Sequence, residues 1–428
     1  MPGNDTVIFD RLETGSNVSL FHYSTRKFKS VVVRFFLSGS LGSDVEEEAI
    51  LPSILRRGSR DYPSLAAVSR ALETLYGTRI SIDVTKIGER QVFACGLNMV
   101  NERLLPNATG LIESAGAVCR DVLTNPLVEK ESFLPAVFAT EKINLERAIR
   151  SLINDKGVYA GIRLVEEMFR GQPYGNHPMG DAGKVAGLDP AKTYSFFRNF
   201  LNVAPMDVYV MGDITSDEAL SLFRSVFGGI ERGEEAALPA ESTPVVGDGA
   251  VFEEEQAIEQ SKLAIGFNVD NCCDDDLYFA FFFYNAILGG GAYSKLFKNV
   301  REKESLAYYA SSGYDKTKGF LKISAGIQRE NFSRAVEIVA EQMDDITAGK
   351  ITDEEFSNAR KSLLSGLRAV NDVPGHLIDY DFVTRLAGRE NRIDRIADRV
   401  ERVTRDQVAA SGRLVTKGKT FFLKGTAG

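Results

Sequence analysis

One order of segments occurs twice in this chain, at an interval of about 210 residues. In the first copy, the β-rich run Val31–Leu37 leads through an acidic stretch into an apolar helix that ends near Gly58. In the second copy, the run Leu263–Val269 leads through Asp274–Asp276 into the apolar helix Leu277–Leu288. A chain with such a pattern is expected to fold as two related domains rather than as one large core.

Later landmarks keep nearly the same interval. Asn154-Asp155 and Asn371-Asp372 each follow a segment with helical periodicity and lie 217 residues apart. Each half closes with an apolar strand and a glycine, and these glycines, Gly212 and Gly425, lie 213 residues apart. Near-constant intervals indicate duplication of a domain, and chance similarity between two unrelated α+β domains is the alternative.

The local patterns favour an α+β fold, with two homologous domains that each contain a largely antiparallel sheet covered by helices. Alternating strands such as Arg79–Val84 and Phe320–Ser324 suit sheets with one face against helices. Three threonines begin capping boxes, which mark helix starts: Thr215, Thr352 and Thr404. Asp189-Pro190 fits an N-cap followed by proline in the first helical turn.

An acidic stretch rich in glycine, proline and serine separates the two halves. We predict an N-terminal domain at 1–227, a linker at 228–255 and a C-terminal domain at 256–428.

Charge and composition exclude several functions. The 51 Lys and Arg residues face 59 Asp and Glu, a net charge of −8 that opposes general nucleic-acid binding. The most apolar run, Leu277–Leu288, is shorter than the about 20 residues needed to cross a bilayer, so no membrane partner is expected. No signal peptide is visible, and the four cysteines form no C-x-x-C pair. We therefore expect a cytoplasmic protein with free thiols.

A glycine-rich turn in the second half carries the strongest family resemblance. The segment Leu288–Phe297, followed by Val300–Tyr308, resembles the C-terminal pattern of the insulinase, pitrilysin and mitochondrial processing peptidase family, with Ser305 in place of the usual glycine. Weaker matches occur in the expected order at Pro173–Gly180, Glu259–Gly266 and Ile351–Glu355. The resemblance covers about residues 8 to 425 and implies two homologous α+β domains.

Active members of that family carry the inverted zinc motif H-x-x-E-H on the first apolar helix. Three residues that cannot supply this chemistry occupy the two ligand positions and the base position: Ala49, Pro52 and Ser53. A different alignment does not help, because no histidine lies between His22 and His177. A third ligand would fall near Glu146–Ala148, where the register stays open. We expect this chain to hold no metal and no other cofactor.

The resemblance also implies an arginine and a tyrosine that face the zinc from the C-terminal half or from a non-catalytic partner chain. Arg301 and Tyr308 match those positions, and such groups can orient a peptide carbonyl and stabilise an oxyanion. Two structural alternatives stay open. Arg301 could pair with Glu302 or Glu304 on a solvated helix face, and Tyr308 could be a core aromatic residue beside Tyr309.

Gly289, Gly290 and Gly291 lie where two-chain processing peptidases have a glycine-rich loop that meets the substrate. The resemblance therefore implies substrate binding, and a tight turn after the helix is the alternative. Phosphate binding is excluded because G-x-x-x-x-G-K-[ST] is absent.

These observations predict a non-catalytic subunit of a two-chain zinc metallopeptidase. The homologous partner would carry H-x-x-E-H and the zinc, forming a heterodimer, while Arg301 and Tyr308 complete the site. Peptide substrates would bind by addition to a sheet edge. The alternative is a non-enzymatic scaffold or binding protein that keeps the peptidase fold.

Overall fold

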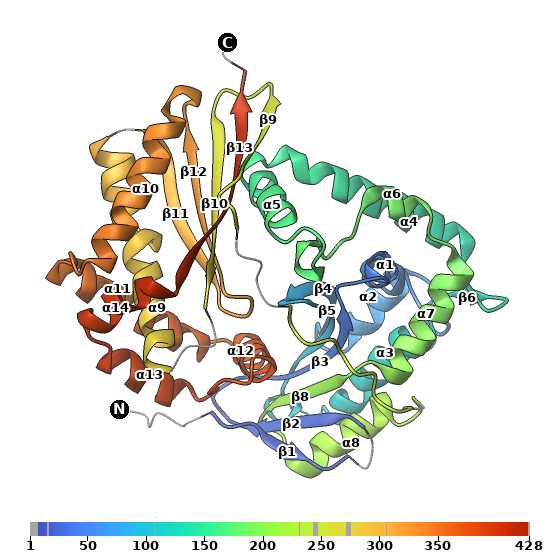
Figure 1. Cartoon of the computed structure of the whole chain (residues 1–428). Coiled ribbons are helices and arrows are strands. Elements are labelled where there is room, and N and C mark those ends of the chain that lie inside the picture. Colours follow the sequence, from blue (N-terminus) through green and yellow to red (C-terminus); the bar gives the residue numbers. More distant parts are fainter. Residues whose placement is uncertain are drawn as a thin grey trace. The chain divides into compact units, whose positions relative to one another are not determined.

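Two β-sheets, each in its own structural unit, organise the chain (Figure 1). The computed structural model describes residues 7–14, 17–106, 108–230, 232–242, 247–270, 275–304 and 306–426. Asp274, Ser305 and the adjacent cysteines Cys272 and Cys273 lie outside the described residues.

The sheet of the first unit has six strands. Their order across the sheet is β1 (Asp10–Leu12), β2 (Ser19–Ser24), β8 (Met206–Gly212), β3 (Ser30–Ser40), β5 (Arg90–Val100) and β4 (Arg79–Ile87). Neighbouring strands are antiparallel except β2 and β8, which are parallel. A small hairpin of β6 (Val128–Glu129) and β7 (Ser132–Phe133) lies outside this sheet.

The sheet of the second unit repeats this topology. Its order is β11 (Ala307–Asp315), β12 (Phe320–Ile327), β10 (Ser261–Val269), β13 (Val415–Gly425) and β9 (Val251–Gln256). Here β9 and β13 form the parallel pair, and the other neighbours are antiparallel. Apart from β1, each strand of the first sheet has a counterpart at the equivalent position in the second. The predicted fold class, a duplicated α+β domain, is confirmed.

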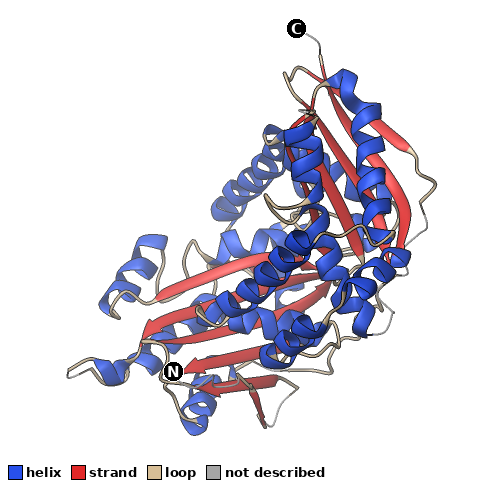
Figure 2. Ribbon diagram, turned by 90° about the vertical axis from the view of Figure 1, so that its left-hand side faces the viewer, coloured by secondary structure: helices blue, strands red, loops and turns tan. Residues whose placement is uncertain are grey.

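Helices cover the sheets of both units (Figure 2). The first half of the chain contains α1 (Val45–Leu55), α2 (Leu65–Thr74), α3 (Leu111–Thr124), α4 (Pro135–Ser151), α5 (Lys156–Met168), α6 (Ala182–Ala186), α7 (Pro190–Val203) and α8 (Ser216–Phe227). The second half contains α9 (Asp275–Gly289), α10 (Phe332–Thr347), α11 (Asp353–Val370), α12 (Pro374–Leu386), α13 (Ile393–Arg402) and α14 (Arg405–Ser411). The predicted capping boxes form at Thr215, Thr352 and Thr404, and Asp189 caps α7.

The two units exchange one helix each. The first unit comprises residues 1–150, 176–240 and 373–386, and the second comprises 151–175, 241–372 and 387–428. Helix α12, from the second half of the sequence, therefore belongs to the first unit, and helix α5, from the first half, belongs to the second unit.

Packing on the second face of each sheet explains this exchange. In the first unit, the ring of Phe36 on β3 stacks on Phe382 of α12 with 3.9 Å between centroids, and the Tyr209 hydroxyl of β8 donates to Asp381 at 2.7 Å. In the second unit, α5 buries Leu164 against a cluster that includes Phe421 of β13. Each sheet thus gains a second covering layer, which buries apolar surface on both of its faces.

The compact units are consequently not contiguous in sequence, unlike the predicted domains 1–227 and 256–428. Strand β9 also begins inside the predicted linker 228–255. Its sequence, VFEEEQ, contains few apolar residues, because exposed and half-buried positions alternate along this edge strand. No helix among the described residues is long and apolar enough to cross a bilayer.

Candidate functional site

Helix α1 carries the positions of the zinc motif. Pro52 is buried, and Ala49 and Ser53 are half-buried. The Ser53 hydroxyl donates to the Ile50 carbonyl at 2.9 Å, so its hydrogen is used within the helix. Among the described residues, no group of three His, Cys, Asp or Glu side chains could hold a metal ion. The α1 positions therefore offer neither an imidazole pair nor a carboxylate base.

A buried carboxylate from α4 reaches the end of α1 and is neutralised there. The Arg57 guanidinium donates through Nε to Oε1 of Glu141 at 2.6 Å, and the Asn144 amide donates to Oε2 at 3.3 Å. Sequence reasoning did not single out Glu141, although it is an acid on the otherwise buried side of a helix. In the region where a third ligand was expected, Glu146 instead lies 3.5 Å from Arg150 of its own helix.

A second buried acid, Glu48, lies on α1 itself. Glu48 is 2% exposed, and its Oε1 has no hydrogen-bond partner among the described residues. Burial raises the pKa of Glu48 well above its usual value, and the charge of Asp44 adds to the shift. A buried carboxyl with a raised pKa, one turn before Pro52, fits a helix whose role is structural.

Arg301 and Tyr308 are both exposed, and both occupy irregular backbone. Arg301 belongs to the π-helical segment Phe297–Lys303, and its guanidinium carbon lies 4.6 Å from the centroid of the Phe297 ring. Tyr308 is 71% exposed and is the extra residue of a β-bulge in β11, between the pairs Ala307–Ile327 and Tyr309–Gly326. The alternative that made Tyr308 a core residue is therefore wrong.

Among the described residues, no hydrogen bond or cation–π contact joins Arg301 to Tyr308. The π-helical segment packs against β11, and the Leu306 amide donates to the Val300 carbonyl at 3.0 Å. The structure thus places the two side chains on adjoining elements of one unit, and their catalytic role stays a prediction.

The three glycines after α9 differ in their surroundings. A Cβ on Gly289 would lie 2.3 Å from the backbone nitrogen of Ser312, and one on Gly290 would lie 2.7 Å from the Cα of Ala286. At Gly291 the nearest atom would be in the Tyr293 side chain, at 3.1 Å. Packing alone therefore requires glycine at the first two positions, as the tight-turn alternative expects. Substrate contact by these glycines stays a prediction.

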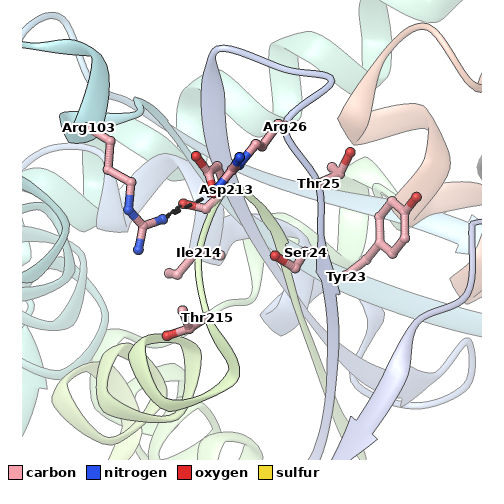
Figure 3. Close-up of a pocket in the computed structure, with 8 residues that line it drawn as sticks. All are labelled: Tyr23, Ser24, Thr25, Arg26, Arg103, Asp213, Ile214 and Thr215. Carbon is pink, nitrogen blue, oxygen red and sulfur yellow. Dashed lines mark hydrogen bonds and ion pairs between the residues drawn. The ribbon is translucent and has the colours of Figure 1, made fainter. Parts of the chain in front are cut away.

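A cavity of about 770 Å³ in the first unit lies where β2 and β8 end (Figure 3). Two arginines turn toward Asp213: Nε of Arg26 lies 3.6 Å from Oδ1, and Nη1 of Arg103 lies 3.4 Å from it. Arg103 also donates to Glu218 at 2.7 Å, while Thr215 caps the start of α8. The polar groups of this cavity largely satisfy one another, so it offers little to a charged ligand.

Comparisons with known proteins agree with the fold. The family model described as the peptidase M16 inactive domain matches residues 187–363. A Bacillus subtilis (strain 168) protein named probable inactive metalloprotease YmfF is 32% identical over 405 residues, which cover 94% of this chain and 95% of that protein.

Solved structures give the same picture. A conserved protein from Enterococcus faecalis V583 has a TM-score of 0.90 at 25% identity, covering 98% of this chain and 99% of the other. A peptidase M16 inactive domain from Pseudomonas fluorescens has a TM-score of 0.81 at 18% identity, with the same coverage, and supports the fold.

Fold and site together define a metallopeptidase homologue whose motif lacks metal ligands. The chain belongs to the M16 peptidase family, and its residues 187–363 match the model of that family's inactive domain. This confirms the resemblance read from the sequence.

Proposed function

We propose that this chain is the non-catalytic subunit of a two-chain zinc metallopeptidase that cleaves peptides. The homologous partner would supply H-x-x-E-H and the zinc, and this chain would supply Arg301 and Tyr308. The observation that carries the proposal is the exposure of both side chains on irregular backbone, a π-helical segment and a β-bulge. Such irregularities occur frequently at functional sites, where they aim a side chain.

The chemistry of the two groups suits peptide hydrolysis. Zinc bound by the partner would polarise the peptide carbonyl and activate water. The Arg301 guanidinium would donate hydrogen bonds to the carbonyl oxygen as it becomes an oxyanion, and the Tyr308 hydroxyl would donate another. A guanidinium carries N–H donors and a phenol carries an O–H donor, so this role requires no proton transfer to or from either group.

The test is the activity of the assembled pair. We expect Arg301→Ala to cost about 2–4 kcal/mol of transition-state stabilisation, measured as a loss of kcat/KM, because one oxyanion donor is lost. Tyr308→Phe, which removes only the hydroxyl, should lower kcat more than it raises KM. Arg368→Ala, on an exposed position of α11, serves as the matched control.

Two results would contradict the proposal. Unchanged kcat/KM in the assembled Arg301→Ala complex would show that this arginine does not act in the reaction. Purification from the native organism without a similar-sized partner bearing H-x-x-E-H would favour the scaffold function instead.

A further inference from the structure

An open cavity of about 790 Å³ lies on the sheet of the second unit, where α5 begins. We call it the lysine cavity and define it by six of its lining residues: Asp155, Lys156, Lys262, Tyr309, Lys322 and Ser324. Three strands and one helix start contribute to it, and all of them belong to the second unit. Arg301 is not among the residues that line it.

Small residues leave this part of the sheet uncovered. Helix α5 packs over β10 and β13, whereas the same face of β11 carries the exposed residues Ser311 and Gly313. On the neighbouring strand β12, Ser324 pairs with Ser311, and Lys322 pairs with Gly313. A Cβ on Gly313 would have no neighbour within 4 Å, so the floor of the cavity is open above β11 and β12.

Two of the three lysines of the cavity donate to neutral partners. The Lys156 ammonium donates to the amide oxygen of Gln256 at 2.7 Å, and the Lys262 ammonium donates to that of Gln260 at 2.6 Å. Lys322 forms no ion pair among the described residues, and burial against α5 lowers its pKa. Burying an ammonium without a counter-charge is costly, and a bound anion would relieve that cost.

The one carboxylate that lines the cavity is already engaged. Oδ1 of Asp155 accepts the backbone N–H groups of Gly157 and Val158, both at 3.0 Å, and so caps α5. Burial lowers the pKa of Lys262, and the negative charge of Asp155 acts in the opposite direction. One carboxylate against three ammonium groups leaves the lysine cavity with two positive charges in excess.

We propose that the lysine cavity binds a carboxylate of an extended peptide, held by Lys322 and Lys262 with Ser324 and Tyr309 as hydroxyl donors. The peptide would lie along β11, which is an edge strand of its sheet and can pair with an added strand. The carboxylate comes either from the peptide C-terminus or from an acidic side chain. The peptide class rests on the proposed function, whereas the anion site rests on the cavity alone.

Three fluorescent peptides of one neutral sequence test the site by anisotropy with the full chain. One ends in a free carboxylate, one ends in an amide, and one ends in an amide but contains a central glutamate. We expect a carboxylate to tighten binding by about tenfold at low ionic strength, and added salt to weaken this preference. Lys322→Met and Lys262→Met should each remove most of the preference, while Lys361→Met, an exposed lysine on α11, should keep it.

The outcomes identify the source of the carboxylate or overturn the site. Tight binding of the free acid alone identifies a C-terminal carboxylate, and tight binding of the glutamate peptide alone identifies a side chain. Equal binding of all three peptides, no binding, or a preference that survives both lysine substitutions in folded protein overturns the site. The preference for a carboxylate is measured on this chain alone, whereas the Arg301 assay measures the activity of the assembled pair. Failure of the anion site can therefore be distinguished from failure of the proposed subunit function.

Discussion

Single residues on α1 decide what this helix can do. Active relatives need two imidazoles and a carboxylate at positions that here hold Ala49, Pro52 and Ser53. Among the acids that α1 buries is Glu48, and burial together with the charge of Asp44 raises its pKa well above the ordinary value. The helix therefore contributes packing rather than metal chemistry.

The raised pKa of Glu48 makes stability depend on pH in a defined direction. Its pKa in the folded chain lies above the ordinary 4.5, so the folded state retains a proton that the unfolded state releases. Its contribution to stability is therefore lost progressively as the pH rises above that ordinary value. Relative to wild type, the Tm of Glu48→Gln should therefore rise progressively as the pH increases above the ordinary value of 4.5. Glu73→Gln, on an exposed position of α2, should show no such trend, and a parallel trend in both variants would refute the assignment.

At the scale of elements, the junction of α9 with β11 determines the geometry after the glycines. Helix α9 approaches β11 so closely that the Ser312 hydroxyl donates to the Asn285 side chain at 2.8 Å. Gly289 permits this approach, since any side chain there would meet the strand backbone. The following π-helical segment and the bulge at Tyr308 then carry the two exposed candidate residues.

Substitutions of two glycines separate packing from substrate binding. Gly289→Ala should lower the free energy of unfolding by about 1–3 kcal/mol, because its methyl group overlaps the backbone of β11. Gly291→Ala should change stability little, since only the movable Tyr293 side chain lies nearby. Urea unfolding measures both. Equal losses in the two variants would contradict this packing, and a change in peptide affinity for Gly291→Ala alone would support the predicted substrate contact.

At the scale of the whole molecule, the exchanged helices link the folding of the two halves of the sequence. The first unit needs α12 to cover β3 and β8, and the second needs α5 to cover β10 and β13. Neither half of the sequence alone contains all the elements of one unit. Folding of each unit therefore requires long-range contacts, which close large loops of chain.

Reciprocal substitutions test the exchange. Phe382→Ala on α12 should cost about 3–5 kcal/mol and weaken hydrogen-exchange protection in β3 and β8, although both strands lie in the first half of the sequence. Leu164→Ala on α5 should cost about 2–5 kcal/mol and weaken protection in β10 and β13 instead. Each variant is the control for the other. The exchange would be contradicted if Phe382→Ala instead weakened protection in β10 and β13, or if Leu164→Ala instead weakened protection in β3 and β8.

Much of the fold could be predicted because it depends on local patterns. Duplicated spacing, capping boxes at Thr215, Thr352 and Thr404, and the missing ligands at Ala49, Pro52 and Ser53 follow directly from residue identity and order. Strand β9 escaped prediction because an exposed edge strand needs few apolar residues.

The sequence by itself determined the duplicated α+β fold and the absence of a zinc motif, because periodicity and ligand chemistry are properties of residue types and their spacing. Only the tertiary structure decided that α5 and α12 each pack in the unit formed mainly by the other half of the sequence. It also decided that Tyr308 is exposed and that Lys262 and Lys322 line one cavity. These features depend on which distant segments bury one another's apolar faces, and burial is a property of the folded chain as a whole.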